Sequence, residues 1–176
     1  MGRRSTQRGR VRQLGAVIAL AALVACSPQT QAEASADKSI TMAQADAPAV
    51  HPVSGLEVIP LSVQTDEGSY DFRVEVADTP EAQAQGLMFR TELGEFEGMI
   101  FPYDGTTAQS FWMKNTPLPL DIIFIGPDRK ISNIAEMTTP YSLESVYSVG
   151  PVLGVLELSG GRAAELGIEA GDTVEW

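Results

Sequence analysis

The sequence contains one cysteine, Cys26, and one histidine, His51, among 176 residues. A single cysteine excludes an intramolecular disulfide. Because His51 lies in a segment with few apolar residues, the apolar part of the chain lacks a Ser-His-Asp or Cys-His nucleophile system. A zinc site would have to be built from carboxylates alone, an improbable ligand set for that metal. We therefore expect no metal centre and no histidine-dependent active site, and the sequence indicates no cofactor.

Basic residues are also scarce, with 12 Lys and Arg against 23 Asp and Glu. Five of the basic residues precede Cys26, so the chain from Cys26 onward carries a formal charge of about −16. A surface of this charge repels phosphate backbones and anionic lipid headgroups. The composition thus disfavours binding to nucleic acid and electrostatic docking on a membrane.

The N-terminus has the pattern of an export signal. Its arginines precede an apolar run from Leu14 to Ala25, which is too short to span a bilayer. The run ends in Leu23-Val24-Ala25-Cys26, which resembles the lipobox of bacterial lipoproteins. Residues 1–25 are therefore predicted to be a lipoprotein signal peptide, and Cys26 is predicted to be the lipidation site.

Lipid on Cys26 is the predicted link to the membrane. More than one acyl chain on a single cysteine gives stable anchoring, whereas a single chain binds marginally. Ser27 follows the cysteine, and in the lipoproteins that this sequence resembles a residue other than aspartate favours the outer membrane. We expect a protein of the cell envelope that is lipid-anchored, faces the periplasm and resides in the outer membrane.

The remaining chain divides into two parts. Residues 26–55 comprise the lipidated N-terminus and a small, polar, Pro-containing segment that predicts a disordered tether. Residues 56–176 have the length and apolar content of one globular domain.

The pattern of this domain is mostly that of strands. Apolar and polar residues alternate over 59–64 and 70–76 around a turn at 66–69, which predicts an opening β-hairpin. A cap oxygen and a proline in Asp78-Thr79-Pro80-Glu81 predict a helix that ends at Gly86. Further strands are predicted at 99–103, 109–114, 121–125, 130–137, 152–158 and at the C-terminus, with a second short helix over 160–166 capped by Ser159. The expected fold class is β-dominated α+β, a compact and mainly antiparallel sandwich or barrel-like domain with two short helices.

The richest functional signal is the segment 111–121. Strand alternation places Phe111 and Met113 on one face, and Trp112 and Lys114 on the other. If the first pair fills the core, Trp112 lies at the surface beside a cation, which is typical of a platform that binds sugars or peptides. The alternative is that Trp112 covers a sheet edge, with Lys114 or Arg90 in cation–π contact.

Two carboxylates are further candidates. The turn 115–119 is expected to bring Asp121 back toward Trp112. Glu157 shares its strand face with apolar residues, so it is either paired with a base or has a raised pKa. Arg90 and Lys114 are its candidate partners. Asp121 and Glu157 are also the candidate catalytic residues of an alternative, enzymatic interpretation.

The sequence therefore predicts one ligand-binding site whose residues converge in the folded domain. Its predicted members are Arg90, Trp112, Lys114, Asn115, Asp121 and Glu157.

Several motifs in fixed order carry a family resemblance. They are Gly86-Leu87-Met88-Phe89-Arg90, Gly98-Met99-Ile100-Phe101, Phe111-Trp112-Met113-Lys114-Asn115-Thr116, Leu120-Asp121-Ile122-Ile123-Phe124, Leu156-Glu157-Leu158 and Gly167-Ile168 with Gly171-Asp172. Over about residues 72–174 the chain resembles the family catalogued as domain of unknown function 192. The resemblance implies a compact β-rich fold with short helices, often exported, and no established activity.

Three functions are compatible with this inventory. The leading interpretation is a non-catalytic envelope module that binds a small molecule, glycan or peptide at Trp112. The second is a glycan-cleaving enzyme that uses Asp121 and Glu157, which requires the two carboxyl groups to lie about 5–10 Å apart across an open cleft. The third is a purely structural lipoprotein.

Overall fold

The computed structural model describes residues 50–176. The predictions for the signal peptide, for Cys26 and for residues 26–49 of the tether lie outside the described residues. Within residues 50–176, no helix has the length and apolar character needed to cross a membrane.

The predicted hairpin and first helix are confirmed. Strands β1 (Val58–Thr65) and β2 (Gly68–Val76) pair along their full lengths. Helix α1 (Pro80–Gln85) begins where the Thr79 hydroxyl accepts a hydrogen bond from the Ala82 amide at 3.1 Å. It ends at Gly86, whose φ of 49° favours a residue without a Cβ.

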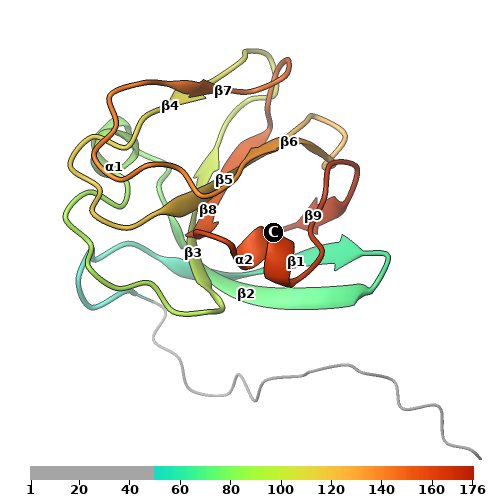
Figure 1. Cartoon of the computed structure of the whole chain (residues 1–176), viewed down its shortest axis with the longest axis horizontal. Helices are drawn as coiled ribbons and strands as arrows, with labels where there is room; N and C mark the ends of the chain where they lie inside the picture. Colours follow the sequence, from blue (N-terminus) through green and yellow to red (C-terminus); the bar gives the residue numbers. More distant parts are fainter. Residues whose placement is uncertain (1–49) are drawn as a thin grey trace, which may run out of the picture. The chain divides into compact units, whose positions relative to one another are not determined.

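The remaining strands complete a curved sheet. They are β3 (Glu97–Pro102), β5 (Leu120–Ile125), β6 (Ile131–Ala135), β8 (Gly154–Ser159) and β9 (Thr173–Glu175). The strand order is β6-β5-β8-β3-β2-β1-β9, and among these neighbours only β2 and β3 run parallel. A bridge between Lys130 and Thr173 joins the two ends, so the sheet nearly closes into a barrel (Figure 1). The observed domain is thus a β-dominated α+β fold, as predicted.

Two apolar layers lie on opposite faces of β3, β5 and β8. One is enclosed by the curved sheet and includes Phe72, Ile123 and Leu156. The other includes Met99 and Ile122, and is covered by a second, two-stranded sheet of β4 (Ser110–Phe111) and β7 (Val146–Tyr147). The central strands are therefore apolar on both faces, as the sequence of 121–125 indicates.

The structure also confirms that Phe111 and Met113 point into the core while Trp112 lies at the surface. Met113 is 3% exposed, and the Phe111 ring makes edge-to-face contacts with Phe101 and Phe124 at centroid distances of 5.0 and 6.2 Å. Trp112 is 47% exposed. The side-chain alternation inferred from the sequence thus holds, although the strand itself is shorter than predicted.

Two local predictions need correction. The strand expected over 109–114 ends at Phe111, because the chain turns through Asn115 with a φ of 56°. The second helix, α2 (Arg162–Glu165), starts after Gly161 rather than at a Ser159 cap. The amide of Gly161 donates instead to the Asp121 carboxylate at 3.0 Å, so a residue 40 positions earlier in the chain replaces the local cap.

The boundary of the folded domain also lies earlier than predicted. Residues 50–55, assigned above to the tether, pack on the domain. Val50 forms a bridge with Glu57, the His51 amide donates to the Leu56 carbonyl at 2.8 Å, and the Ser54 hydroxyl donates to the Glu75 carboxylate. His51 therefore belongs to the folded domain, contrary to the expectation from the sequence.

Candidate functional site

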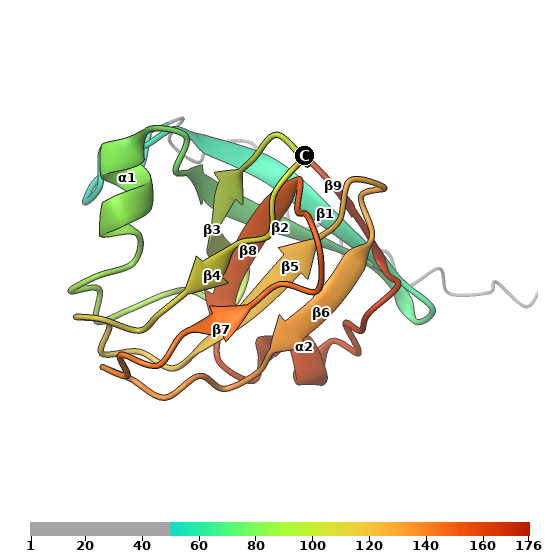
Figure 2. The same ribbon diagram turned by 90° about the horizontal axis from the view of Figure 1, so that it is seen from above.

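Three loops meet at one end of the barrel. They follow α1, β4 and β6, and they lie together at the left of Figure 2. The Phe89 amide donates to the Asn115 carbonyl at 2.8 Å, and the Tyr141 amide donates to the Thr116 carbonyl at 3.1 Å. The turn 115–116 therefore holds the other two loops in place.

Each of these loops contains a residue in the left-handed backbone region. Phe89, Asn115 and Tyr141 have φ values of 64°, 56° and 60°. Such a conformation costs a residue with a Cβ about 1–2 kcal/mol and persists only where the surroundings enforce it. Strain of this kind concentrates at binding and catalytic sites, so these loops form a candidate functional surface.

The same loops expose three aromatic rings, which we call the aromatic rim: Phe89, Trp112 and Tyr141. Their exposed fractions are 68%, 47% and 63%. The Lys114 ammonium nitrogen lies 5.0 Å from the centroid of the Trp112 ring, within cation–π range. Trp112 and Lys114 are therefore in contact at the surface.

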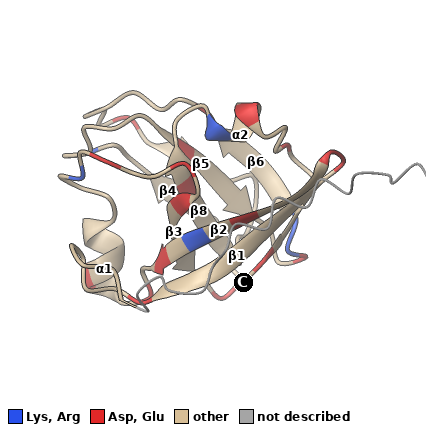
Figure 3. Ribbon diagram, turned by 90° about the horizontal axis from the view of Figure 1, so that it is seen from below, with Lys and Arg blue, Asp and Glu red and all other residues tan. Residues whose placement is uncertain are grey.

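Acidic side chains outnumber basic ones over the described part of the chain, and they are distributed over both strands and loops (Figure 3). Most of the basic side chains already have partners. Arg129 and Arg162 each stack on an aromatic ring and pair with a glutamate, and the Lys130 ammonium donates to the Gly171 carbonyl at 3.4 Å. The field around the domain is thus dominated by carboxylates.

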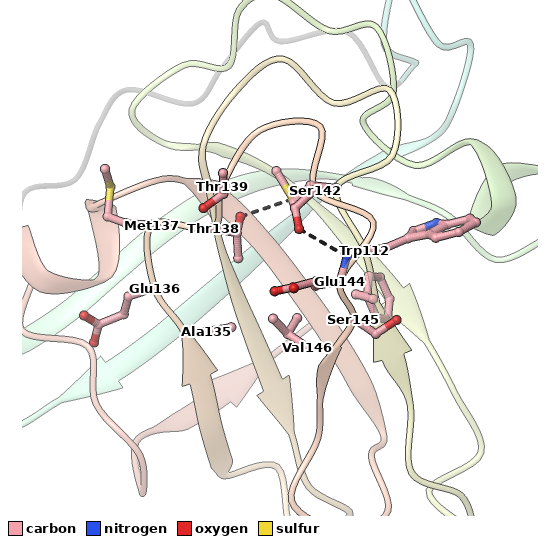
Figure 4. A pocket seen from close by; sticks show the side chains of 12 residues that line it. Trp112, Ala135, Glu136, Met137, Thr138, Thr139, Ser142, Glu144, Ser145 and Val146 are labelled. Atoms are coloured by element: carbon pink, nitrogen blue, oxygen red, sulfur yellow. Dashed lines mark hydrogen bonds between the residues drawn. The ribbon is translucent and has the colours of Figure 1, made fainter.

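A pocket of about 270 Å³ adjoins the aromatic rim. Its lining comes from the ends of β4 and β6 and from the loop that precedes β7, and includes Trp112, Met113, Glu136, Met137, Ser142 and Glu144. In Figure 4 the Glu144 carboxyl group points toward the middle of the lining residues, whereas the Trp112 ring lies at the edge and points away. The pocket and the ring thus form adjacent parts of one surface.

Arg90 does not reach this surface with its side chain. Its guanidinium group forms an ion pair with Glu75 at 2.8 Å and contacts the His51 ring at 3.2 Å. Only 13% of the Arg90 side chain and 4% of the Glu75 side chain are exposed. The prediction that Arg90 is the partner of Glu157 is therefore wrong, because the Arg90 guanidinium group pairs with the Glu75 carboxylate instead.

Asp121 is fully buried and has a structural role. Its carboxylate accepts hydrogen bonds from the amides of Met137 at 2.8 Å, Gly161 at 3.0 Å and Ala163 at 2.8 Å. These contacts tie β5 to the start of α2 and to the end of β6. The expectation that Asp121 lies beside Trp112 as a ligand-binding or catalytic group is corrected accordingly.

Glu157 is buried and has no partner within residues 50–176. It is 5% exposed, its neighbours across the strands are Met99 and Ile122, and among the described residues its carboxyl group has no hydrogen bond or ion pair. Burial raises the pKa of Glu157 to about 8. Burial, and the nearby Glu157 charge to a smaller extent, also raises the pKa of Tyr103 above its ordinary value.

Asp121 and Glu157 cannot act on one substrate together. On β5, Asp121 pairs with Leu158 and belongs to the face that lines the enclosed core. Glu157 pairs with Ile122 and belongs to the opposite face. Because successive side chains on a strand point to opposite faces, the sheet itself separates the two carboxyl groups. This geometry rules out the glycosidase pair considered above.

The structure thus brings together only part of the predicted set. Trp112, Lys114 and Asn115 lie in one loop of the aromatic rim. Arg90 is partly buried in its ion pair with Glu75, and Asp121 and Glu157 are buried in the sheet.

Four residues of this surface were not predicted from the sequence: Phe89, Tyr141, Glu136 and Glu144. Phe89 belongs to one of the ordered motifs, and Glu136 lies in the strand predicted over 130–137, which ends at Ala135 in the structure. Tyr141 and Glu144 lie in a loop without periodicity.

No cluster of three or more His, Cys, Asp or Glu side chains with metal-binding geometry occurs within residues 50–176. The fold and the site together define a small, nearly closed β-barrel domain with a surface pocket and exposed aromatic side chains at one end.

The chain belongs to the DUF192 family, described as "Uncharacterized ACR, COG1430", whose model matches residues 62–176. This confirms the resemblance identified from the sequence motifs.

Solved structures with the same fold include a protein of unknown function from Novosphingobium aromaticivorans DSM 12444. It is 55% identical, with a TM-score of 0.72 over 75% of this chain and 94% of that chain. A putative transcription regulator from Sinorhizobium meliloti 1021 is 38% identical, with a TM-score of 0.66 over 68% of this chain and 94% of that chain. Among curated proteins there is no significant match.

Proposed function

We propose that this protein is a non-catalytic binding module whose ligand contacts the aromatic rim and the adjoining pocket. The observation that carries the proposal is the half-exposed Trp112 ring, held at the edge of a pocket of about 270 Å³ by a strained turn. Exposed aromatic rings contribute large contact areas at little cost in conformational entropy, so they are effective anchors for a ligand.

The chemistry of the site favours binding over catalysis. The pocket is lined by aromatic, aliphatic, thioether, hydroxyl and carboxylate side chains, and its lining in the described chain contains no histidine, cysteine or lysine that could activate a serine. The Ser142 hydroxyl and the Glu144 carboxylate can form hydrogen bonds with a ligand. The Ser142 hydroxyl already accepts one hydrogen bond within the protein, from the Glu144 backbone amide at 3.1 Å. These groups can orient a ligand without changing it covalently.

A role in binding nucleic acid is disfavoured for this chain. The Sinorhizobium structure carries the description of a putative transcription regulator. The present chain has a formal net charge of −11, and contacts with phosphates depend on Lys and Arg. We therefore place the ligand outside nucleic acids.

Substitution of Trp112 by Ala tests the proposed site. Since the ring is 47% exposed, we expect the variant to lose about 1 kcal/mol or less of unfolding free energy, while binding to any ligand of the site is abolished. Urea denaturation measures the first effect, and calorimetric titration with small molecules, oligosaccharides and peptides measures the second.

Phe111→Ala is the matched control at the neighbouring position. Its ring packs against Phe101 and Phe124, so this substitution is expected to cost about 3–5 kcal/mol. A loss of similar size in the Trp112 variant would assign Trp112 to the core and favour a purely structural lipoprotein.

We further propose that the domain is held in the cell envelope, facing the periplasm, by lipid on Cys26. The support is the sequence Leu23-Val24-Ala25-Cys26 behind an arginine-rich segment, followed by Ser27, which favours the outer membrane.

Mass spectrometry of the membrane-extracted protein should detect an acylated Cys26 at the N-terminus. A Cys26→Ala variant should lose the modification and leave the membrane fraction. Cleavage at another position, or an unmodified Cys26, would contradict this assignment.

A further inference from the structure

The Trp112 ring is already in contact with an ammonium group, that of Lys114. The nitrogen lies 5.0 Å from the ring centroid, and both side chains are exposed. No carboxylate of the described chain forms a salt bridge with Lys114. The exposed ring thus holds an ammonium group that no carboxylate of the described chain holds in a salt bridge.

The pocket beside this ring carries two exposed carboxylates, Glu136 and Glu144, and no Lys or Arg of the described chain lines it. Hydrogen bonds through Ser142 tie the main chain of Glu144 to the loop that contains Trp112. The Met113 amide donates to the Ser142 carbonyl at 3.0 Å, and the Glu144 amide donates to the Ser142 hydroxyl at 3.1 Å. An aromatic face for one cation and a carboxylate for another thus lie on connected loops (Figure 4).

We propose that this surface binds a linear polyamine, a ligand with several ammonium groups separated by methylene chains. One ammonium group takes the place of Lys114 on the Trp112 ring, and another pairs with Glu144. This inference rests on the proposed function and names the class of ligand for that site.

Charge distinguishes this ligand from a neutral sugar or an acidic peptide. The formal charge of about −16 on the chain from Cys26 onward raises the local concentration of cations and repels anions. A neutral sugar would gain nothing from this field and would leave Glu136 and Glu144 without a charged partner. Lys114 in this arrangement is an internal competitor that the ligand displaces.

The test is calorimetric titration of the full chain with spermidine at low salt. Binding should weaken as the salt concentration rises. Lys114→Met should bind spermidine about two- to fivefold more tightly, because it removes the competing ammonium group from an exposed cation–π site. Trp112→Leu should bind about tenfold more weakly, and Glu144→Gln about threefold more weakly with a smaller salt dependence.

Glu67→Gln is the matched control, because it removes one carboxylate from the turn between β1 and β2, away from the pocket lining. Its affinity for spermidine should equal that of the unmodified protein. Thermal unfolding of every variant checks that the fold is retained. If Glu67→Gln and Glu144→Gln weaken the affinity for spermidine equally, the binding is a non-specific attraction between opposite charges, and the proposal is overturned.

Other outcomes separate this inference from the proposed function. Weaker binding in Lys114→Met, or no binding of spermidine to the unmodified protein, overturns the polyamine site. Binding of trilysine or of a neutral oligosaccharide that depends on Trp112, without binding of spermidine, also overturns it but leaves the binding module standing. If no compound of any class binds in a Trp112-dependent manner, both proposals fail.

Discussion

Glu157→Gln should make the protein more stable at neutral pH, by about 3 kcal/mol at pH 7. The carboxyl group is buried between Met99 and Ile122 and has no partner in the described part of the chain, and burial raises its pKa from 4.5 to about 8. The folded protein therefore keeps this proton at pH values where the unfolded chain has lost it. A glutamine side chain at this position mimics the protonated acid and carries no such cost.

The pH dependence gives the sharper test of this prediction. Below about pH 4.5 both states are protonated, so the substitution should have little effect on the unfolding free energy. Between pH 4.5 and 8 the unmodified protein should lose stability as the pH rises, because the unfolded state releases the proton first. Urea denaturation at several pH values should thus show two curves that diverge with increasing pH.

Glu75→Gln is the matched control on the same face of the sheet. Glu75 and Glu157 flank Met99 in register, which places them about 10 Å apart at the usual strand spacing. Unlike Glu157, Glu75 is paired with Arg90, so Glu75→Gln should destabilise the protein at pH 7 by leaving a buried guanidinium group without its carboxylate. If both substitutions destabilise equally at pH 7, Glu157 has a partner and the raised pKa is wrong.

Asp121→Ala is expected to cost about 3–5 kcal/mol of unfolding free energy. The carboxylate is fully buried and accepts from three backbone amides, those of Met137, Gly161 and Ala163. Removing it leaves these donors without an acceptor and detaches the start of α2 from β5. Asp121→Asn should cost less than Asp121→Ala, since one acceptor oxygen remains while the new amide group opposes a backbone donor.

Asp128→Ala provides the comparison with an exposed aspartate. Asp128 accepts from a single backbone amide, that of Lys130 at 3.2 Å, in the turn between β5 and β6. Its loss should cost about 1 kcal/mol or less. If chemical denaturation gave a similarly small loss for Asp121→Ala, the carboxylate would not be the acceptor that holds α2, and a functional role for Asp121 would have to be reconsidered.

Solvent access is the reason that we assign a structural role to Asp121 and a binding role to Trp112. Both residues lie in one motif-rich stretch of sequence, so from the sequence they are equal candidates. Their difference is one of access: Asp121 is fully buried and fully bonded, whereas Trp112 is half exposed. Only an accessible side chain can meet a ligand, and the binding proposal therefore depends on the aromatic rim.

The sequence by itself determined the local features of this protein. Alternation predicted β1, β2 and the opposite orientations of Met113 and Trp112, because the two-residue period of a strand is a local property. The cap at Thr79 and the stop at Gly86 predicted α1 for the same reason. The family also followed from short motifs in order. The isolated acid on an apolar strand face predicted either a basic partner or a raised pKa for Glu157, and the structure agrees with the second alternative.

The tertiary structure alone decided which side chains meet. Arg90 pairs with Glu75 and His51 because a loop and an N-terminal segment distant in sequence close over β2. The amides at the start of α2 bind Asp121 across 40 or more residues, and no pattern near Ser159 reveals this. Phe89 and Tyr141 join Trp112 because backbone hydrogen bonds between loops, which carry no periodic signal, bring them together at one end of the barrel. Long-range pairing depends on the closure of the whole sheet, and this is why the site could be located only in part from the sequence.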